Sequence, residues 1–265
     1  MWPTIGPIRM YGTMYLIGIV LHFVLSWRIA KRLQLKRRVW LTASVCYLLG
    51  MIVGAKLLFD LRHGSFDLSA LSQAEHWLCG GMWGGLLAYL AVAVPAILLL
   101  SRNWRAALDL VALTIPIPWI AAKVGCFFNG CCHGRPCSLP WAVTFPEAAR
   151  TAPAGVPIHP TQLYEVGLML ILLLVFAALK SPRWQGTKLL WFLLLYGFGR
   201  AATDIFRGDT EQYLVPGLLS LTQLICFSVA VAALAALVLS SQGLGSSVWL
   251  DDHSGRQRED YGLRV

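Results

Sequence analysis

The sequence predicts an all-α membrane protein with seven transmembrane helices and a structured outer loop between the fourth and fifth helices. Two observations lead to this fold class. Apolar residues make up 57% of the 265 residues and charged residues only 13%, whereas a soluble domain carries about 25% charged residues. Apolar stretches near the roughly 20 residues that span hydrocarbon recur along the whole chain. This composition excludes a soluble globular domain, a disordered chain, a coiled coil and a secreted disulfide scaffold.

The apolar stretches set the bounds of the expected spans. In chain order they are Met10–Trp27, Val39–Phe59, Trp77–Leu100, Ala106–Phe128, Leu163–Leu179, Leu189–Phe206 and Leu214–Leu239. The first stretch lacks a positively charged leader and a small-residue cleavage site, so we expect it to be retained. The loop between the fourth and fifth spans is rich in Pro and Gly, and we expect short strands in it such as Trp141–Phe145.

The distribution of basic residues sets the expected orientation. Of 22 Lys and Arg, 14 fall on the side that holds Arg28–Arg38 and the C-terminal tail, and five fall on the opposite side. Basic loops stay in the cytoplasm, so we expect the N-terminus outside and the C-terminus inside. The chain then divides into a polytopic transmembrane domain over residues 1–240, with its outer loop at 130–162, and a polar cytoplasmic tail over 241–265. The formal charge is +9, but nucleic-acid binding requires a basic soluble face, and this apolar chain offers none.

Six ionisable residues lie inside the expected spans, where charge is costly and normally faces an interior polar site. They are Lys56, Asp109, Lys123, Glu165, Arg200 and Asp204. For Lys56 and Asp109, structural pairing is as acceptable as a role in a site. Arg200 and Asp204 are four residues apart and share a helix face, and Arg207 follows about one turn later. The cations Lys123 and Arg200 and the carboxylate of Asp204, near one leaflet, predict a site for an anionic lipid headgroup, because Arg and Lys both bind phosphate. A purely structural ion network is the alternative.

Four cysteines cluster near the outer end of the fourth span, at Cys126, Cys131, Cys132 and Cys137, together with His133. Their C-x4-C-C-H-x3-C spacing matches no strong zinc pattern. Disulfides on an oxidising outer face are favoured over a metal ion, and a nucleophilic thiol remains open. We expect neither a metal ion nor a cofactor.

Polar residues also gather at the start of the fifth span. In HPTQLYE from His159 to Glu165, Pro160 and Thr161 fit helix initiation, with Thr161 as the cap. His159, Gln162 and Tyr164 are not explained by capping. The glycines of GGMWGG from Gly80 fit either close helix packing or a close approach of a headgroup to the backbone.

These segments resemble, in order, the motifs of the prolipoprotein diacylglyceryl transferase family. The run YGTMY from Tyr11 looks like the family's Y-G-x-M-Y, and GGMWGG looks like the start of its third span. KVGCFFNGCCHGR, from Lys123 through Asn129 and Gly134 to Arg135, resembles its signature R-x-G-N-F-x-N-x-E-x-x-G-R. HPTQLYE resembles H-P-[ST]-Q-L-Y-E, and YGFGRAATDIFR from Tyr196 to Arg207 follows Y-G-x-x-R-x-x-x-E-x-x-R. The resemblance runs from residue 11 to about residue 209.

The resemblance implies an enzyme of the bacterial inner membrane, with a periplasmic N-terminus and a cytoplasmic C-terminus. Such enzymes transfer the diacylglyceryl group of phosphatidylglycerol to the lipobox cysteine of a prolipoprotein signal peptide, forming a thioether and releasing glycerol phosphate. The implied partners are therefore phosphatidylglycerol, the prolipoprotein and the surrounding membrane lipids, with no nucleic acid.

The implied site follows from the matched motifs. Arg200 and Lys123 would neutralise the leaving phosphate, Asp204 and Glu165 would orient these cations, and His133 or His159 would act as base. The expected lipid-binding residues are Tyr11, Trp83, Asn129, Gly134, Arg135, Gln162, Tyr164, Glu165 and Arg207.

The chain departs from the family motifs at several of these positions. Lys123 stands for an Arg, Cys126 for an Asn, Cys131 for a Glu and Asp204 for a Glu, and the His before Gly-Gly is replaced by Trp83 or lost. Two other functions therefore stay open. A diverged paralogue would transfer a lipid moiety to a different acceptor. A lipid-binding or transport protein would also bury charges, although no inverted repeat is visible and the charges gather near one leaflet.

Overall fold

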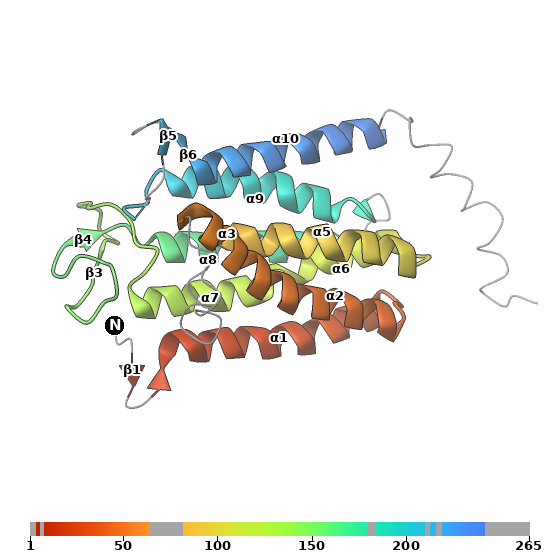
Figure 1. Cartoon of the computed structure of the whole chain (residues 1–265), viewed down its shortest axis with the longest axis horizontal. Coiled ribbons are helices and arrows are strands. Elements are labelled where there is room, and N and C mark those ends of the chain that lie inside the picture. Colours follow the sequence, from red (N-terminus) through yellow and green to blue (C-terminus); the bar gives the residue numbers. More distant parts are fainter. Residues whose placement is uncertain are drawn as a thin grey trace, which may run out of the picture.

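The structure, a computed structural model, describes residues 4–5, 8–63, 82–179, 184–209, 213–215 and 219–241. In this part of the chain, seven helical segments run roughly along the long axis of the molecule (Figure 1). They are α1 (Met10–Arg32), α2 (Arg37–Leu49) with the π-helical turn η1 (Gly50–Gly54) and α3 (Ala55–His63), α5 (Met82–Leu100), α6 (Trp104–Thr114) with α7 (Pro116–Asn129), α8 (Thr161–Ala178), α9 (Lys188–Asp204) and α10 (Leu221–Ser241).

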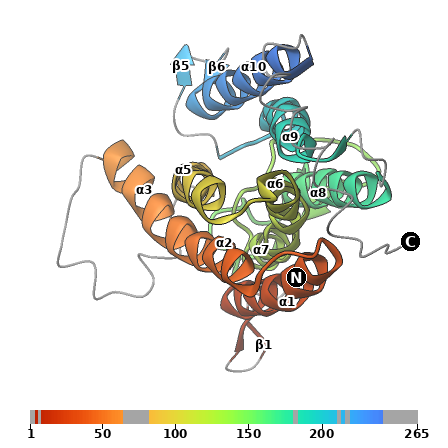
Figure 2. The ribbon, with the colours of Figure 1, turned by 90° about the vertical axis from the view of Figure 1, so that its right-hand side faces the viewer.

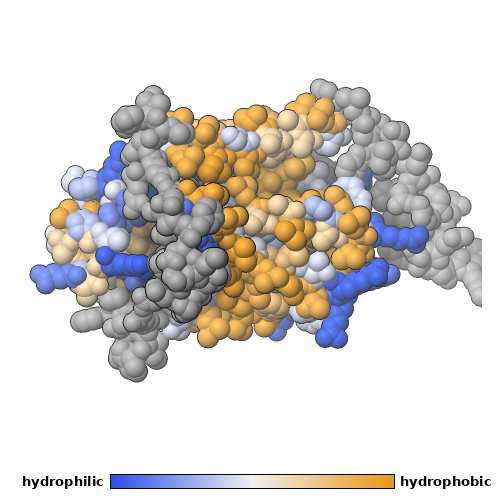
Figure 3. Space-filling model, in the orientation of Figure 1, coloured by the Kyte–Doolittle hydropathy of each residue, from blue (hydrophilic) through white to orange (hydrophobic). Residues whose placement is uncertain are grey.

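Six of the described segments are long and apolar enough to cross a membrane; α9, with 17 residues, is not among them. Apolar side chains cover the middle of the visible face, and polar ones gather toward the two ends (Figure 3). This pattern fits a bilayer, whose hydrocarbon core is about 30 Å thick. A mostly helical fold with six candidate membrane spans is thus confirmed, whereas the seven-span topology and the side on which each terminus lies stay predictions.

The α6–α7 segment forms the centre of the bundle. Its helices lie between α1, α5, α8 and α9 in the end view (Figure 2), and 83% of its most apolar window is buried. Small side chains such as Ala107 and Ala121 make close packing possible on several sides. Pro116 divides the segment into two helices because proline lacks the N–H that an uninterrupted helix requires.

Two glycines set the contact between the π-helical turn and α5. A Cβ atom on Gly84 would collide with the carbonyl of Gly54, and a Cβ on Gly54 would collide with that of Gly84. Only glycine therefore allows this approach. For Gly84 the contact supports helix packing over headgroup binding, while Gly80 and Gly81 lie outside the described residues.

Short antiparallel strand pairs lie in the connections. β1 (Thr4–Ile5) pairs with β2 (Ile8–Arg9), β3 (Val143–Thr144) with β4 (Pro157–Ile158), and β5 (Tyr213–Val215) with β6 (Leu219–Ser220). The strand expected at 141–145 is confirmed over its central two residues. We call the end of the bundle that carries β3, β4 and the start of α1 the loop end (Figure 1).

Two expected helix starts were wrong. The last span was expected from Leu214, but β5 and β6 occupy this region and α10 begins at Leu221. Pro216 and Gly217 are poor helix formers, whereas Ser220 and Gln223 form a reciprocal cap: each side chain accepts a hydrogen bond from the other's backbone N–H at 3.0 Å.

Thr161 does not cap α8. It is the first residue of that helix, and its hydroxyl donates to the carbonyl of Cys132 at 2.7 Å. The side chain thus connects the helix to the loop between α7 and α8 and does not accept a hydrogen bond from the helix's own first turn. Residues 77–81 of the third expected span and 242–265 of the expected tail lie outside the described residues.

Lys56 and Asp109 have structural roles. Lys56 pairs with Asp60 one turn later, at 2.5 Å. Asp109 accepts hydrogen bonds from the backbone N–H groups of Gly186 and Lys188, at 3.1 and 3.3 Å, where α9 begins. The carboxylate thereby satisfies backbone donors that a helix start leaves unpaired.

Candidate functional site

Charged side chains from three helices meet at the carboxylate of Glu165 on α8. The Lys123 ammonium of α7 lies 2.7 Å from Glu165 Oε1, and Nε of Arg200 on α9 lies 3.5 Å from the same oxygen. Arg200 Nη1 also contacts Asp204 Oδ1 at 2.8 Å, one turn along α9. The exposed fraction of these four residues is 5% or less. The expected convergence of cations from the fourth and sixth spans is therefore confirmed.

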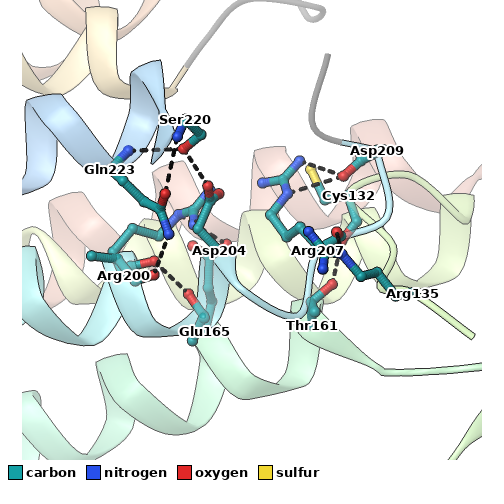
Figure 4. Close-up of polar contacts among 12 residues, drawn as sticks. Cys132, Arg135, Thr161, Glu165, Arg200, Asp204, Arg207, Asp209, Ser220 and Gln223 are labelled. Atoms are coloured by element: carbon teal, nitrogen blue, oxygen red, sulfur yellow. Dashed lines mark hydrogen bonds and ion pairs between the residues drawn. The ribbon is translucent and has the colours of Figure 1, made fainter. Parts of the chain in front are cut away.

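The second oxygen of Asp204 is held by the start of α10. Ser220, the cap of that helix, donates its hydroxyl to Asp204 Oδ2. Gln223 completes the cap and also donates to the carbonyl of Ala201, at 3.4 Å. Figure 4 shows the resulting chain of contacts from Glu165 through Arg200 and Asp204 to Ser220. Both carboxylates beside Arg200 are thus fixed by partners on neighbouring helices.

Aromatic side chains line the same interior. Trp119 donates its indole N–H to Glu165 Oε2 at 3.5 Å, and its ring lies 5.3 Å from that of Tyr196, which in turn lies 5.5 Å from Trp83. Among the buried polar atoms that have no partner within the described residues are Trp83 Nε1, Tyr196 Oη and Gln162 Oε1. An unpaired buried polar atom costs about 1–3 kcal/mol, so this interior contains polar groups that a ligand could satisfy.

Arg207 lies in the turn that follows α9. The helix ends at Asp204, so Arg207, expected about one turn later and close to the same face, follows the helix in a turn. Arg207 pairs with Asp209 at 2.9 Å, and its carbonyl accepts a hydrogen bond from Nε of the exposed Arg135 at 3.0 Å. Although burial opposes its charge, nearby Cys132 and Asp209 raise the pKa of Arg207.

Gly134 brings the loop between α7 and α8 onto this turn. It bridges to Arg207 in antiparallel fashion, and a Cβ atom on it would collide with the carbonyl of His159. Only glycine fits this crossing, so the motif glycine holds the two rim segments together. Arg207 and Arg135 therefore form a second, outer group of charges, which Figure 4 shows apart from the Glu165 cluster.

The two expected bases lie outside the Glu165 cluster. His133 is buried, and its Nδ1 lies 3.1 Å from the carbonyl of Gly134. His159 Nδ1 lies 3.0 Å from the Tyr164 hydroxyl, which also accepts from the Trp141 indole at 2.9 Å. His159 and Tyr164 thus form an aromatic rim group.

The remaining expected residues connect the cluster to the loop end. Gln162 is fully buried and donates to the carbonyl of Cys131 at 2.8 Å. Asn129 lies at the end of α7 and donates to Cys131 Sγ at 3.6 Å. Tyr11 is half-buried near the start of α1, where its backbone packs on Gly125 of α7. The structure thus brings each of these three residues toward the end of α7.

The thiols of Cys126, Cys131 and Cys132 converge at that point. Gly130 adopts a left-handed conformation (φ 69°) that ends α7, and the N–H of Cys131 then donates back to the carbonyl of Cys126 at 3.2 Å. This turn brings the three Sγ atoms within 4.8 Å of one another. All six cysteines in the described part of the chain are free thiols, so the disulfides expected from the sequence are not formed there.

Comparison with known proteins identifies the family. The sequence model of the family described as "Prolipoprotein diacylglyceryl transferase" matches residues 3–239. The chain belongs to this family. The resemblance inferred from the sequence motifs is thereby confirmed, and this family is one of membrane-bound transferases.

Named relatives in the diacylglyceryl transferase family align over most of the chain. A phosphatidylglycerol–prolipoprotein diacylglyceryl transferase of Coxiella burnetii is 32% identical over 78% of this chain and 81% of its own. Proteins with the same name from Nitrosomonas europaea and Pseudomonas putida are 30% and 33% identical, over 96% and 88% of this chain and 90% of their own.

Several contacts of this candidate site were not predicted. Trp119, Ser220 and Asp209 each contact a predicted charge. The Ser-x-x-Gln pattern at Ser220 is a recognisable capping box and could have placed the start of α10, although not its contact with Asp204. No sequence signal indicated the indole of Trp119.

Proposed function

We propose that the protein transfers the diacylglyceryl group of phosphatidylglycerol to the lipobox cysteine of a prolipoprotein, in the bacterial inner membrane and with the loop end facing the periplasm. Family membership over nearly the whole chain supports the reaction. The observation that carries the site is the convergence of Lys123 and Arg200 on one oxygen of Glu165. A buried, preorganised pair of cations suits a leaving group that develops phosphate charge.

Arg200 is the principal phosphate ligand in this proposal. Its Nε and Nη1 are directed at Glu165 and Asp204, and neither of these two ion pairs uses Nη2. A guanidinium held rigidly by two carboxylates still presents donors to a phosphate oxygen. Lys123 adds a point charge on the other side of Glu165. The two carboxylates balance the two cations in the resting protein and keep their geometry fixed.

The reaction replaces a C–O bond with a C–S bond. The acceptor thiol loses its proton, and its sulfur attacks the glyceryl carbon that carries the phosphate ester. The C–O electrons leave with glycerol phosphate, whose negative charge the two cations offset. His133 and His159 remain the candidates for the proton acceptor, because imidazole is the side chain that most often serves as a general base.

The outer residues position the substrates. Arg207 and Arg135 lie at the rim, where they would attract an anionic headgroup. Tyr11, Asn129, Gln162 and Tyr164 supply hydrogen-bonding groups, and the unpaired atoms of Trp83 and Gln162 add interior ones. Gly134 acts indirectly by allowing the rim segments to cross.

The decisive test is complementation of a strain depleted of its own diacylglyceryl transferase. The wild-type chain should restore growth, and Arg200→Ala should not, although it accumulates in membranes. Arg38→Ala, which removes an exposed cation at the opposite end of the bundle, serves as the matched control and should behave like the wild type. Full prolipoprotein lipidation by Arg200→Ala would refute this site.

The identity of the acceptor is tested with purified protein, phosphatidylglycerol and a lipobox peptide. Mass spectrometry should find a thioether-linked diacylglyceryl group on the peptide cysteine. Turnover of phosphatidylglycerol with an unmodified peptide would favour a different acceptor. Lipid binding without turnover would favour the transport function.

A further inference from the structure

Three cysteines at the end of α7 form a set of sulfur ligands that the proposed phosphate site does not use. Their Sγ atoms lie within 4.8 Å of one another. Tetrahedral zinc, with Zn–S bonds of about 2.3 Å, needs sulfurs about 3.8 Å apart. The three thiols would therefore close around an ion by shifts of about 1 Å or less, which side-chain rotation can supply.

The backbone is shaped to gather these sulfurs. The left-handed turn at Gly130 folds the chain back over the end of α7. Cys132 itself has a positive φ of 59°, a conformation that is uncommon outside glycine and costs about 1–3 kcal/mol. It allows two consecutive side chains to face the same cluster. Hydrogen bonds from Gln162 and Thr161 to the carbonyls of Cys131 and Cys132 hold this turn in place.

The surroundings suit a negatively charged metal–thiolate centre. Lys123 lies one turn before Cys126 on α7, and both Lys123 and Arg207 are close enough to Cys132 to act on it electrostatically. Three thiolates around a divalent ion carry one net negative charge, which these cations can balance. Asn129 donates to Cys131 Sγ at 3.6 Å, in the manner of the outer hydrogen bonds that orient metal ligands.

We propose that Cys126, Cys131 and Cys132 bind a zinc ion and that the thiol of the acceptor cysteine occupies its fourth coordination position. Three protein ligands with one open position are typical of catalytic rather than structural zinc. The second part rests on the proposed function, in which a thiol is the acceptor. The sequence spacing predicted no zinc site, because the turn at Gly130, and not a linear pattern, brings these three ligands together.

The metal would activate the acceptor thiol for attack on the lipid. Coordination to zinc deprotonates a thiol outright, so the acceptor binds as a zinc thiolate and its proton passes to solvent. The coordinated sulfur then forms the C–S bond, the C–O bond to phosphate breaks, and glycerol phosphate leaves with the bonding electrons. The resulting thioether is a weaker ligand than a thiolate, which favours its release from the zinc.

Metal binding is tested on the full chain, purified in detergent under reducing conditions. After incubation with Zn²⁺ and removal of excess, elemental analysis should find one zinc per chain. Cys132→Ser and Cys131→Ser should each weaken binding at least about a hundredfold, and Asn129→Ala by about tenfold. Cys226→Ser removes a buried thiol on α10 and should bind like the wild type. Chelation of the wild type provides a metal-free sample that does not depend on folding of a variant.

Cobalt substitution reports the ligands directly. Co²⁺ bound to the wild type should show sulfur-to-metal charge-transfer absorption, which should increase when a lipobox peptide is added and stay unchanged with a peptide carrying Ser in place of Cys. Absence of stoichiometric zinc, retention of zinc by Cys132→Ser, selective binding of Cu(I), or isolation of any two of the three cysteines as a disulfide from native membranes would each overturn the proposal.

Transfer assays separate this proposal from the proposed function. Equal lipidation by zinc-loaded and metal-free protein would overturn the catalytic role of zinc and leave the transferase function intact. A peptide-dependent cobalt spectrum without any transfer from phosphatidylglycerol would instead support the metal site and contradict the function.

Discussion

Replacement of Glu165 by Gln tests whether its carboxylate holds two buried cations together. Glu165 is 2% exposed and contacts Lys123 at 2.7 Å and Arg200 at 3.5 Å. Removing one partner of a buried ion pair costs about 3–5 kcal/mol, because the remaining charge stays buried and uncompensated. Since Arg200 retains Asp204, Lys123 alone loses its counter-charge. We therefore expect a loss near the lower limit, about 3 kcal/mol in the free energy of unfolding.

This loss is measurable as a shift in melting temperature. For a chain of this size, 1 kcal/mol corresponds to about 2–4 °C, so Glu165→Gln should lower Tm by roughly 6–12 °C in detergent, followed by intrinsic tryptophan fluorescence. Glu165→Gln combined with Lys123→Met removes both members of the pair and should recover most of the loss. Asp209→Asn, at the partly exposed pair with Arg207, should cost less than about 1 kcal/mol.

The double variant decides the interpretation. If Glu165→Gln melts like the wild type, or if removal of Lys123 gives no recovery, the cluster does not depend on mutual charge compensation. The assigned arrangement of Lys123 and Arg200 around one carboxylate would then be refuted.

Three further predictions concern packing, capping and thiol ionisation. Gly84→Ala should destabilise the protein by about 1–3 kcal/mol through overpacking. Gly167→Ala, whose Cβ would meet open space, should be neutral or stabilising by up to about 1 kcal/mol. Equal melting temperatures for the two variants would contradict the close contact between Gly84 and Gly54. Ser220→Ala should cost at least about 1 kcal/mol of unfolding free energy from the lost cap and should also reduce transfer activity. Unchanged activity would show that the hydrogen bond from Ser220 to Asp204 is dispensable. Hydrogen bonds from neighbouring thiols and nearby cations hold the pKa of Cys132 well below its usual range, so in metal-free protein its alkylation should persist at lower pH than for an ordinary thiol. Arg207→Gln should raise the pKa of Cys132 and shift the alkylation profile to higher pH. A profile that does not move would exclude the Arg207 guanidinium as a cause of the low pKa.

The sequence predicted most helices and the central charges for the same physical reason. Apolar runs of spanning length leave few alternatives to a helix in a membrane, and a charge within such a run requires a partner. Lys123, Glu165 and Arg200 were therefore recognisable, and the four-residue spacing predicted the pair of Arg200 with Asp204. That pair is present at 2.8 Å.

Contacts that depend on chain reversal could not be predicted in this way. The hydrogen bond from Ser220 to Asp204 forms because the chain reverses through the β5–β6 strand pair before α10 begins. The thiol cluster depends on the left-handed turn at Gly130. Thr161 illustrates the same limit, because its hydroxyl suits a helix cap but finds a nearer acceptor in the outer loop. The expected orientation of the bundle remains a prediction from loop charge.

The hydrogen bond between Ser220 and Asp204 has a consequence for biogenesis. The Asp204 side chain, which positions the guanidinium of Arg200, is itself positioned by Ser220 at the start of α10. Ribosomes synthesise α10 after the other described helices, so the charged cluster cannot be fully assembled while those helices are already entering the bilayer. A nascent chain is thus expected to stay inactive toward lipid until α10 has been inserted.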